Sequence, residues 1–309
     1  MQGFAAHATV MPIEERVGEC LTRFGDALVP VARGRWRITR PGDGAAPTTV
    51  VVDQGWLVVE QTFSDCRLAR VGDVERWGRR LLDAARKLPS GARPVLPADN
   101  DRVQMRAERS LPPRPGDGED HDLWRWIESA CADVANGPVA AVPTAADEDA
   151  QNRRARDEAV RSDIPALCEL AGWPATPRGA CDETLVALPT RDGDLCHAIA
   201  SVAGAAVRFR IALEISGAGE TTPASLAAVA VALLRVAGSV RLIRSTLTQV
   251  DGKIAATLDV HMHPPLGPET VDDALSTLSV AHQLVAAELA ALAGSDSLAI
   301  AYLALQGAR

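Results

Sequence analysis

The sequence predicts an α+β protein of two tandem domains, each an antiparallel sheet with helices packed on it. Three observations support this prediction. The chain has 309 residues, which is longer than a usual single domain. Segments with period-2 apolar alternation are interspersed with segments of helical periodicity. The same order of segments, α-β-β-β-α-β-β-α, occurs twice at a separation of about 150 residues.

The first half opens with a helix. Pro12 stands in its first turn, acidic residues follow near its N-terminal end, and apolar residues recur at helical spacing as far as Leu28. Three strands are then expected, at residues 34–40, 48–53 and 56–63. The turn dipeptide Gln54-Gly55 separates the last two, so the three strands read as an antiparallel meander.

A second helix is expected from Asp73, ending before Pro89, and a third from Asp120, where an Asx-type residue caps the first turn. A hairpin connects these helices, with strands at residues 94–96 and 102–110. The composition then changes to Pro, Ala, Thr and acidic residues, which is typical of an exposed linker. The predicted domains are therefore residues 1–140 and 156–309, joined by a linker at 141–155.

The second half repeats this order. Its elements are a helix at residues 163–173, strands at 183–188, 197–202 and 206–215, a helix from Thr222, a hairpin at 240–262, and a last helix at 268–293. Thr222 followed by Pro223 is a typical helix start. Asp251-Gly252 between two alternating runs is a strong hairpin signal, because both residues tolerate the positive φ of a tight turn.

Corresponding elements of the two halves are separated by between about 147 and 151 residues. This regularity predicts a duplicated domain whose copies cover each other's apolar faces as a pseudo-dimer. Chance agreement between approximate element boundaries is the alternative.

The last helix carries an a/d seam for packing against another helix or the sheet. The seam consists of Val271, Leu275, Leu278, His282, Val285, Leu289 and Leu292. His282 is expected to be a buried, hydrogen-bonded histidine, and a proton-sensitive contact is the alternative.

The repeated element order, the helix that ends in Leu170-Ala-Gly-Trp173, and the hairpin ahead of a long helix resemble the type III secretion chaperone-like fold. Acidic secretion chaperones share that fold with a group of bacterial sensory-transduction regulators. The resemblance implies a non-enzymatic protein that holds another polypeptide, usually as a dimer. A tandem copy would replace the homodimer by an intramolecular pseudo-dimer.

The net charge of −8 is spread over both halves, and neither half has a basic excess. Binding to nucleic acid is therefore not expected. The N-terminus lacks a basic segment followed by a long apolar run, so we expect neither membrane attachment nor a leader, and a cytoplasmic location. The six cysteines form no CxxC pair and are expected to be free thiols.

Two residues are candidates for a partner surface. Trp124 and Trp126 lie two positions apart on a predicted helix, about 200° around its axis, so both cannot lie on one buried face. Exposed Trp is enriched at contact hot spots. Packing between the two domains is the alternative role for this pair.

Metal and cofactor chemistry have little support in the sequence. His261 and His263 alternate along a strand and point to one face with Asp259, which makes these three residues a weak candidate metal site. No complete nucleotide-binding or hydrolase motif is present, and no cofactor is expected.

The sequence therefore favours a non-enzymatic chaperone-like or adaptor protein with a protein partner, present as a monomeric pseudo-dimer or a weak homodimer. An enzyme with an unrecognised active site between the two halves is one alternative, and a structural self-assembly module is the other. A chaperone should expose an apolar groove or an unpaired strand edge, whereas an enzyme should contain a deep pocket with clustered ionisable groups.

Overall fold

The structure is a computed structural model. It describes residues 11–39, 46–85, 92–111, 119–136, 163–178, 183–190, 193–203, 206–215, 222–250, 253–263 and 266–308. The chain divides into two compact units, residues 1–62 with 105–137 and residues 63–104 with 138–309. The predicted linker and the domain boundaries at residues 140 and 156 lie outside the described residues.

The described residues form two six-stranded antiparallel sheets, which confirms the α+β class. The first sheet has the order β1 (Leu28–Ala32), β2 (Arg35–Ile38), β3 (Thr48–Asp53), β4 (Trp56–Arg67), β6 (Arg102–Ser110), β5 (Arg93–Val95). The second has the order β7 (Ala175–Pro177), β8 (Glu183–Pro189), β9 (Leu195–Ala203), β10 (Ala206–Ile215), β12 (Lys253–Met262), β11 (Arg244–Val250). The two sheets therefore share one strand order.

The predicted element order was wrong by one strand in each half, because four strands, not three, precede each middle helix. It also lacked a last helix, α8 (Asp296–Leu305), in the second half. The missed strands are β1 and β7, which are short edge strands that contain Pro30 and Pro177. Proline within an apolar run argues against a strand, except at a sheet edge. The first helix was also predicted too long: α1 (Ile13–Leu21) passes into a 3₁₀ turn, η1 (Thr22–Ala27), where Gly25 has φ 56°.

In the first unit, α1 and α3 (Glu119–Asn136) pack on β3 of the first sheet. Their inward-facing residues are Val17 and Leu21 of α1 and Leu123 and Ile127 of α3, all buried. The hydrophobic spacing that predicts these two helices is therefore the spacing of their buried faces.

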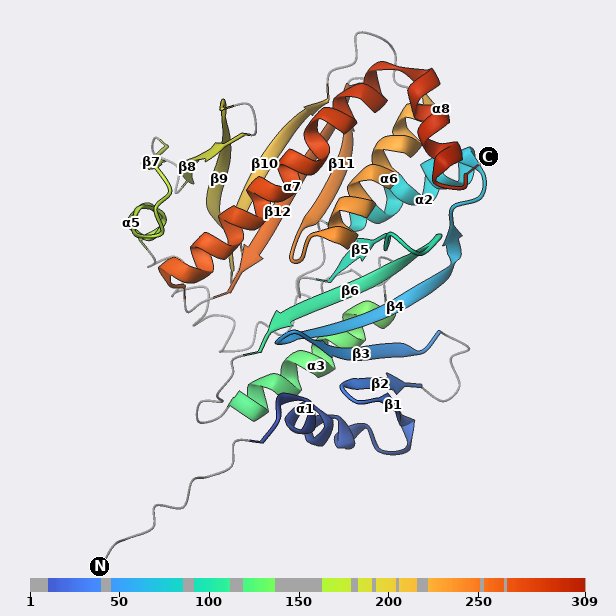
Figure 1. The fold of residues 1–309 in the computed structure, drawn as a ribbon, viewed down its shortest axis with the longest axis vertical. Coiled ribbons are helices and arrows are strands. Elements are labelled where there is room, and N and C mark those ends of the chain that lie inside the picture. Colours follow the sequence, from blue (N-terminus) through green and yellow to red (C-terminus); the bar gives the residue numbers. More distant parts are fainter. Residues whose placement is uncertain are drawn as a thin grey trace, which may run out of the picture. The chain divides into compact units, whose positions relative to one another are not determined.

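In the second unit, α7 (Pro268–Gly294) runs across one face of the second sheet and packs on β10 and β12 (Figure 1). The predicted a/d seam is confirmed at its aliphatic positions, all of which are buried. His282 is only partly buried, and desolvation lowers its pKa. Thr270 fixes the start of α7, because its Oγ1 accepts a hydrogen bond from the Gly267 N–H at 2.9 Å.

The helix α6 (Pro223–Ser239) is the centre of this unit and packs against α2 (Val71–Ala85), α7 and α8 (Asp296–Leu305). Nearly all of its side chains are buried, and most are Ala, Val or Leu. The α2–α6 contact is very close at Gly78, where an added Cβ would lie 2.8 Å from the Cβ of Ala230. Small residues at this point allow the two helix backbones to approach each other.

The same helix also holds the segment after β5. The Leu96 N–H donates to the Leu234 carbonyl at 2.9 Å, and the Arg235 guanidinium donates to the Pro97 carbonyl. A Cβ at Gly238 would lie 2.7 Å from the Leu96 carbonyl oxygen, so this position requires glycine. Backbone hydrogen bonds and a glycine contact thus fix β5 against α6.

We expect Gly78→Ala to lower the free energy of unfolding by about 1 to 3 kcal/mol, because the new methyl group overlaps Ala230. Gly72→Ala, on the same helix with no atom near the added Cβ, should be neutral or stabilising by up to about 1 kcal/mol. Urea unfolding of the two variants measures both effects. Ala230→Gly should partly rescue Gly78→Ala, and equal stability of the two single variants would contradict this packing.

Candidate functional site

A polar network lies on the face of the second sheet that β10, β11 and β12 present away from α7. Asp259 of β12 is paired in register with Arg210 and Arg244 on the neighbouring strands. The Arg210 Nε donates to the Asp259 Oδ1 at 2.6 Å, and Asp259 is almost fully buried. A buried carboxylate needs such a charged partner.

Arg244 is buried beside this pair, and desolvation lowers its pKa to about 10. Asp259 opposes that shift, whereas Arg93 of β5 and Arg208 of β10 reinforce it. Arginines of three strands therefore act on one another electrostatically, and two of them, Arg210 and Arg244, flank the buried aspartate. A network of this kind restrains the relative positions of the strands.

Two of the three candidate metal ligands, Asp259 and His261, fall in this network and are already engaged there. The His261 Nδ1 lies 3.2 Å from the Arg244 Nη1, which can only donate, so Nδ1 is the acceptor and the imidazole is neutral. Burial and then Arg244 and the other nearby cations lower the pKa of His261 to about 3. His263 is exposed beyond the end of the strand. In the part of the chain that the structure describes, no three His, Cys, Asp or Glu side chains could hold a metal ion.

Trp124 and Trp126 both lie on α3 and both are half-buried. The Trp124 ring is 5.1 Å from the Phe24 ring, and the Arg23 guanidinium lies 5.1 Å from the Trp124 centroid. Trp124 thus contacts two residues of η1 within its own unit. The partner-binding role of this pair stays a prediction.

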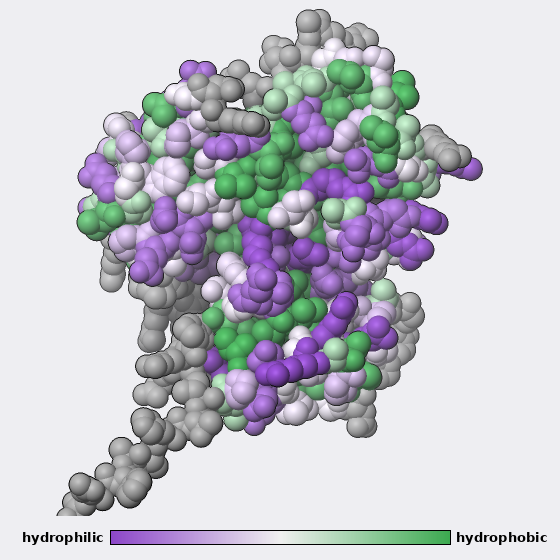
Figure 2. Space-filling model, viewed as in Figure 1, coloured by the Kyte–Doolittle hydropathy of each residue, from purple (hydrophilic) through white to green (hydrophobic). Residues whose placement is uncertain are grey.

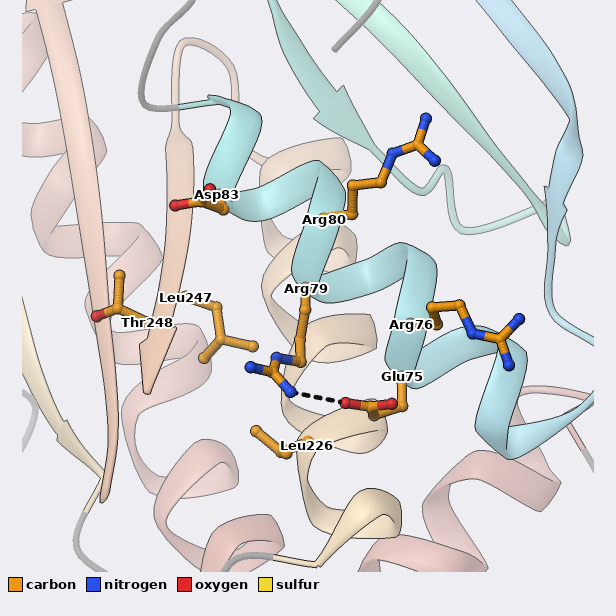
Figure 3. Close-up of a pocket in the computed structure, with 8 residues that line it drawn as sticks. All are labelled: Glu75, Arg76, Arg79, Arg80, Asp83, Leu226, Leu247 and Thr248. Atoms are coloured by element: carbon orange, nitrogen blue, oxygen red, sulfur yellow. Dashed lines mark hydrogen bonds and ion pairs between the residues drawn. The ribbon is translucent and has the colours of Figure 1, made fainter. Parts of the chain in front are cut away.

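An open groove of about 520 Å³ lies beside α2 in the second unit. Glu75, Arg79 and Asp83 line it from α2, while Leu226 of α6 and Leu247 of β11 supply apolar side chains (Figure 3). Arg79 and Asp83 point toward β11, and Arg79 pairs with Glu75 at 3.1 Å.

The groove has a structural origin. The helix α6 packs against both α2 and α8. Asp296, at the start of α8, accepts a hydrogen bond from the Ser225 hydroxyl of α6 at 3.0 Å. Among the described residues, α6 is the one helix that packs extensively on α2. The groove is therefore an uncovered flank of α2, and two acidic and three basic side chains of that helix line it.

A more extensive surface feature is the outer side of α7 and α8, which we call the α7–α8 face. Its exposed apolar residues are Val280, Leu284, Ala287 and Ala291 of α7 and Leu298, Ile300, Ala301, Ala304 and Leu305 of α8. Leu284, Leu298, Ile300 and Leu305 are each more than half exposed, at 59%, 53%, 56% and 86%. Figure 2 shows apolar colour over both helices. Large exposed apolar patches are typical of interaction sites.

The α7 part of this face is an ordered stripe. Val280, Leu284, Ala287 and Ala291 follow one another at spacings of four, three and four, opposite the buried seam. Such spacing presents one continuous apolar strip along a helix. This stripe was missed in the sequence, although the same heptad reading that predicts the buried seam also contains it.

The sheet edges offer less to a partner. Three of the four edge strands contain a proline, at Pro30, Pro94 and Pro177, and a proline cannot donate to an added strand. The fourth edge strand, β11, packs against α2. The α7–α8 face is therefore the better candidate for contact with another polypeptide.

Within the described residues, α7 is also the one helix long and apolar enough to span a membrane. Its buried seam packs on the second sheet. Core helices of globular proteins have the same length and composition, so this property carries little weight.

No protein-family model matches the chain, and comparison with curated proteins and with solved structures finds no match. The resemblance to the type III secretion chaperone-like fold therefore stays a prediction. The exposed surfaces of the described residues are therefore the basis for a functional proposal.

The neutral state of His261 leads to a pH-dependence of stability. The pKa of His261 is about 3 in the folded protein and should return to its ordinary value of 6.5 on unfolding. Between these values the unfolded chain binds a proton that the folded chain does not, so stability falls as the pH drops through this window.

We therefore expect the melting temperature of the wild type to fall more between pH 7 and pH 5 than that of His261→Gln. The Gln carbonyl can still accept from Arg244 but cannot titrate. His121→Gln, at an exposed position on α3, is the control and should behave as the wild type. Identical pH profiles for all three proteins would contradict a neutral, partly buried His261.

Proposed function

We propose that this protein is a non-enzymatic, chaperone-like or adaptor protein that binds a polypeptide partner in the cytoplasm. The observation that carries the proposal is the α7–α8 face, where four large aliphatic side chains are each more than half exposed. Leaving such side chains in water forgoes about 1.5 to 3 kcal/mol each relative to burial. A partner that covers them would recover part of this free energy.

We further propose that the chain is an internal pseudo-dimer of two related halves. The two sheets share one strand order, which supports a duplication. A two-fold relation would exchange α2 with α6 and β5 with β11, and both α2–β11 and α6–β5 contacts are present. It would also bring equivalent positions together. Arg93 and Arg244, separated by 151 residues in the sequence, interact electrostatically, as this relation requires.

The pseudo-dimer would explain why the helix pair is internal to one chain. In a homodimer, α2 and α6 would be the same helix from two subunits, and their contact would depend on protein concentration. Joined in one chain, the halves can diverge. One copy can then retain a helix pair such as α7 and α8 for partner binding while the other does not.

The proposal can be tested by recovery of a partner from the native host with an affinity-tagged chain. We expect Leu284→Asp to lower the recovered partner by more than about tenfold, because it places a charge in the centre of the apolar stripe. Leu195→Asp, at a position on β9 that is 62% exposed, is the matched control and should retain the partner. Both variants should unfold at the wild-type temperature, because both side chains are exposed.

Retention of the partner by Leu284→Asp would overturn the assignment of the α7–α8 face. Loss in a Trp124→Ala, Trp126→Ala variant instead would transfer the site to α3. Recovery of a small metabolite without any protein would favour the enzyme alternative.

A further inference from the structure

The α7–α8 face combines exposed apolar side chains with charges of one sign. No Lys or Arg occurs between Lys253 and Arg309. The acidic residues of the two helices are Glu269, Asp272, Asp273, Glu288 and Asp296. Glu288 is the one charged residue within the apolar stripe from Val280 to Ala291, and no Lys or Arg of the two helices offsets its charge.

Glu288 lies within the apolar stripe. It follows Leu284 by four positions and precedes Ala291 by three, so all three side chains are neighbours on the surface of α7. Desolvation raises the pKa of Glu288. Burial raises the pKa of Tyr302 of α8, the charge of Glu288 raises it further, and Arg235 of α6 opposes this shift. The carboxylate is thus placed near the junction of the two helices, and it makes no salt bridge with any described residue.

We propose that the α7–α8 face binds an amphipathic helix of a partner protein whose Lys or Arg side chain pairs with Glu288. This inference rests on the proposed function and specifies the partner's chemistry. The apolar stripe from Val280 to Ala291 is about 16 Å long, which matches three turns of a partner helix. A helix laid along this stripe would present its own apolar residues at the same three- and four-residue spacing.

Charge complementarity distinguishes this partner from two others. A second copy of the chain would bring one acidic face against another, and like charges across an interface oppose association. A membrane surface with anionic lipids would likewise repel these acidic helices. A basic amphipathic helix matches both the apolar stripe and the charge.

The test uses the full chain and two model helices. One is a short amphipathic peptide of Leu and Lys, and the other is the same peptide with Glu in place of Lys. Binding of each labelled peptide is measured by fluorescence anisotropy at low and physiological salt. The protein variants are Leu284→Asp, Glu288→Gln, and Glu269→Gln, which makes the same change on the same helix about 28 Å along its axis.

We expect the Lys peptide to bind at least about tenfold more tightly than the Glu peptide, with an affinity that falls as salt is added. Glu288→Gln should weaken the Lys peptide about three- to tenfold, and Glu269→Gln should leave it unchanged. Leu284→Asp should strongly weaken binding of the Lys peptide, even though this substitution adds a negative charge to the protein. That last result would exclude unspecific attraction between a basic peptide and an acidic protein.

Equal binding of the two peptides, or equal effects of Glu288→Gln and Glu269→Gln, would overturn the inference. The proposed function would survive that outcome if Leu284→Asp still lost the native partner. A concentration-dependent dimer that Leu284→Asp abolishes would assign the face to a second copy. Leu284-dependent binding to phosphatidylserine vesicles would assign it to membranes, and either result would overturn the basic-helix partner.

Discussion

The close packing of α6 against α2 is the contact on which the second unit depends. Gly78 and Ala230 let the two backbones approach each other, and Gly238 allows the segment after β5 to lie directly on α6. A helix composed mainly of Ala, Val and Leu can be buried on all sides, because it carries few polar side chains that would lose hydration. Among the helices that the structure describes in this unit, α2, α7 and α8 pack on this central helix, and α5 (Ile164–Leu170) does not.

The burial of α6 explains how α7 and α8 are arranged. Both helices contact α6, and α7 also covers the second sheet, so each buries one side in the unit. Leu289 and Leu292 of α7 and Leu303 of α8 are buried there. The opposite sides carry Leu284, Ile300 and other apolar residues, although packing within the unit does not require them. The exposure of these apolar residues is the observation on which the proposed partner surface depends.

The sequence predicted those elements whose signals are local. Thr222 accepts a hydrogen bond from the Ser225 N–H at 3.1 Å as an N-cap, α7 begins at Pro268, and β11 pairs with β12 as the hairpin requires. It missed β1 and β7, because their pairing with a neighbouring strand is a tertiary property and proline conceals it. It also placed a candidate partner surface on Trp124 and Trp126, because two residues two positions apart on a helix cannot both lie on one buried face, and this stays a prediction. The α7–α8 face is built from Leu, Ile, Val and Ala, whose exposure depends on which side of a helix the sheet covers.

The two faces of the second sheet differ in character, one apolar and the other polar. On the side of α7, Phe209 and Ile211 of β10 and Leu258 of β12 form a dry core, whereas Arg210, Asp259 and His261 occupy the other side of the same strands. Charged groups buried there are held by one another, so a partner could not use them without breaking those pairs at a cost of about 3 to 5 kcal/mol. Glu288 is different, because it has no salt bridge to lose among the described residues and its neighbours on α7 are apolar. Recognition of charge is therefore less costly at the exposed helix than at the sheet, which favours the helix as the binding surface.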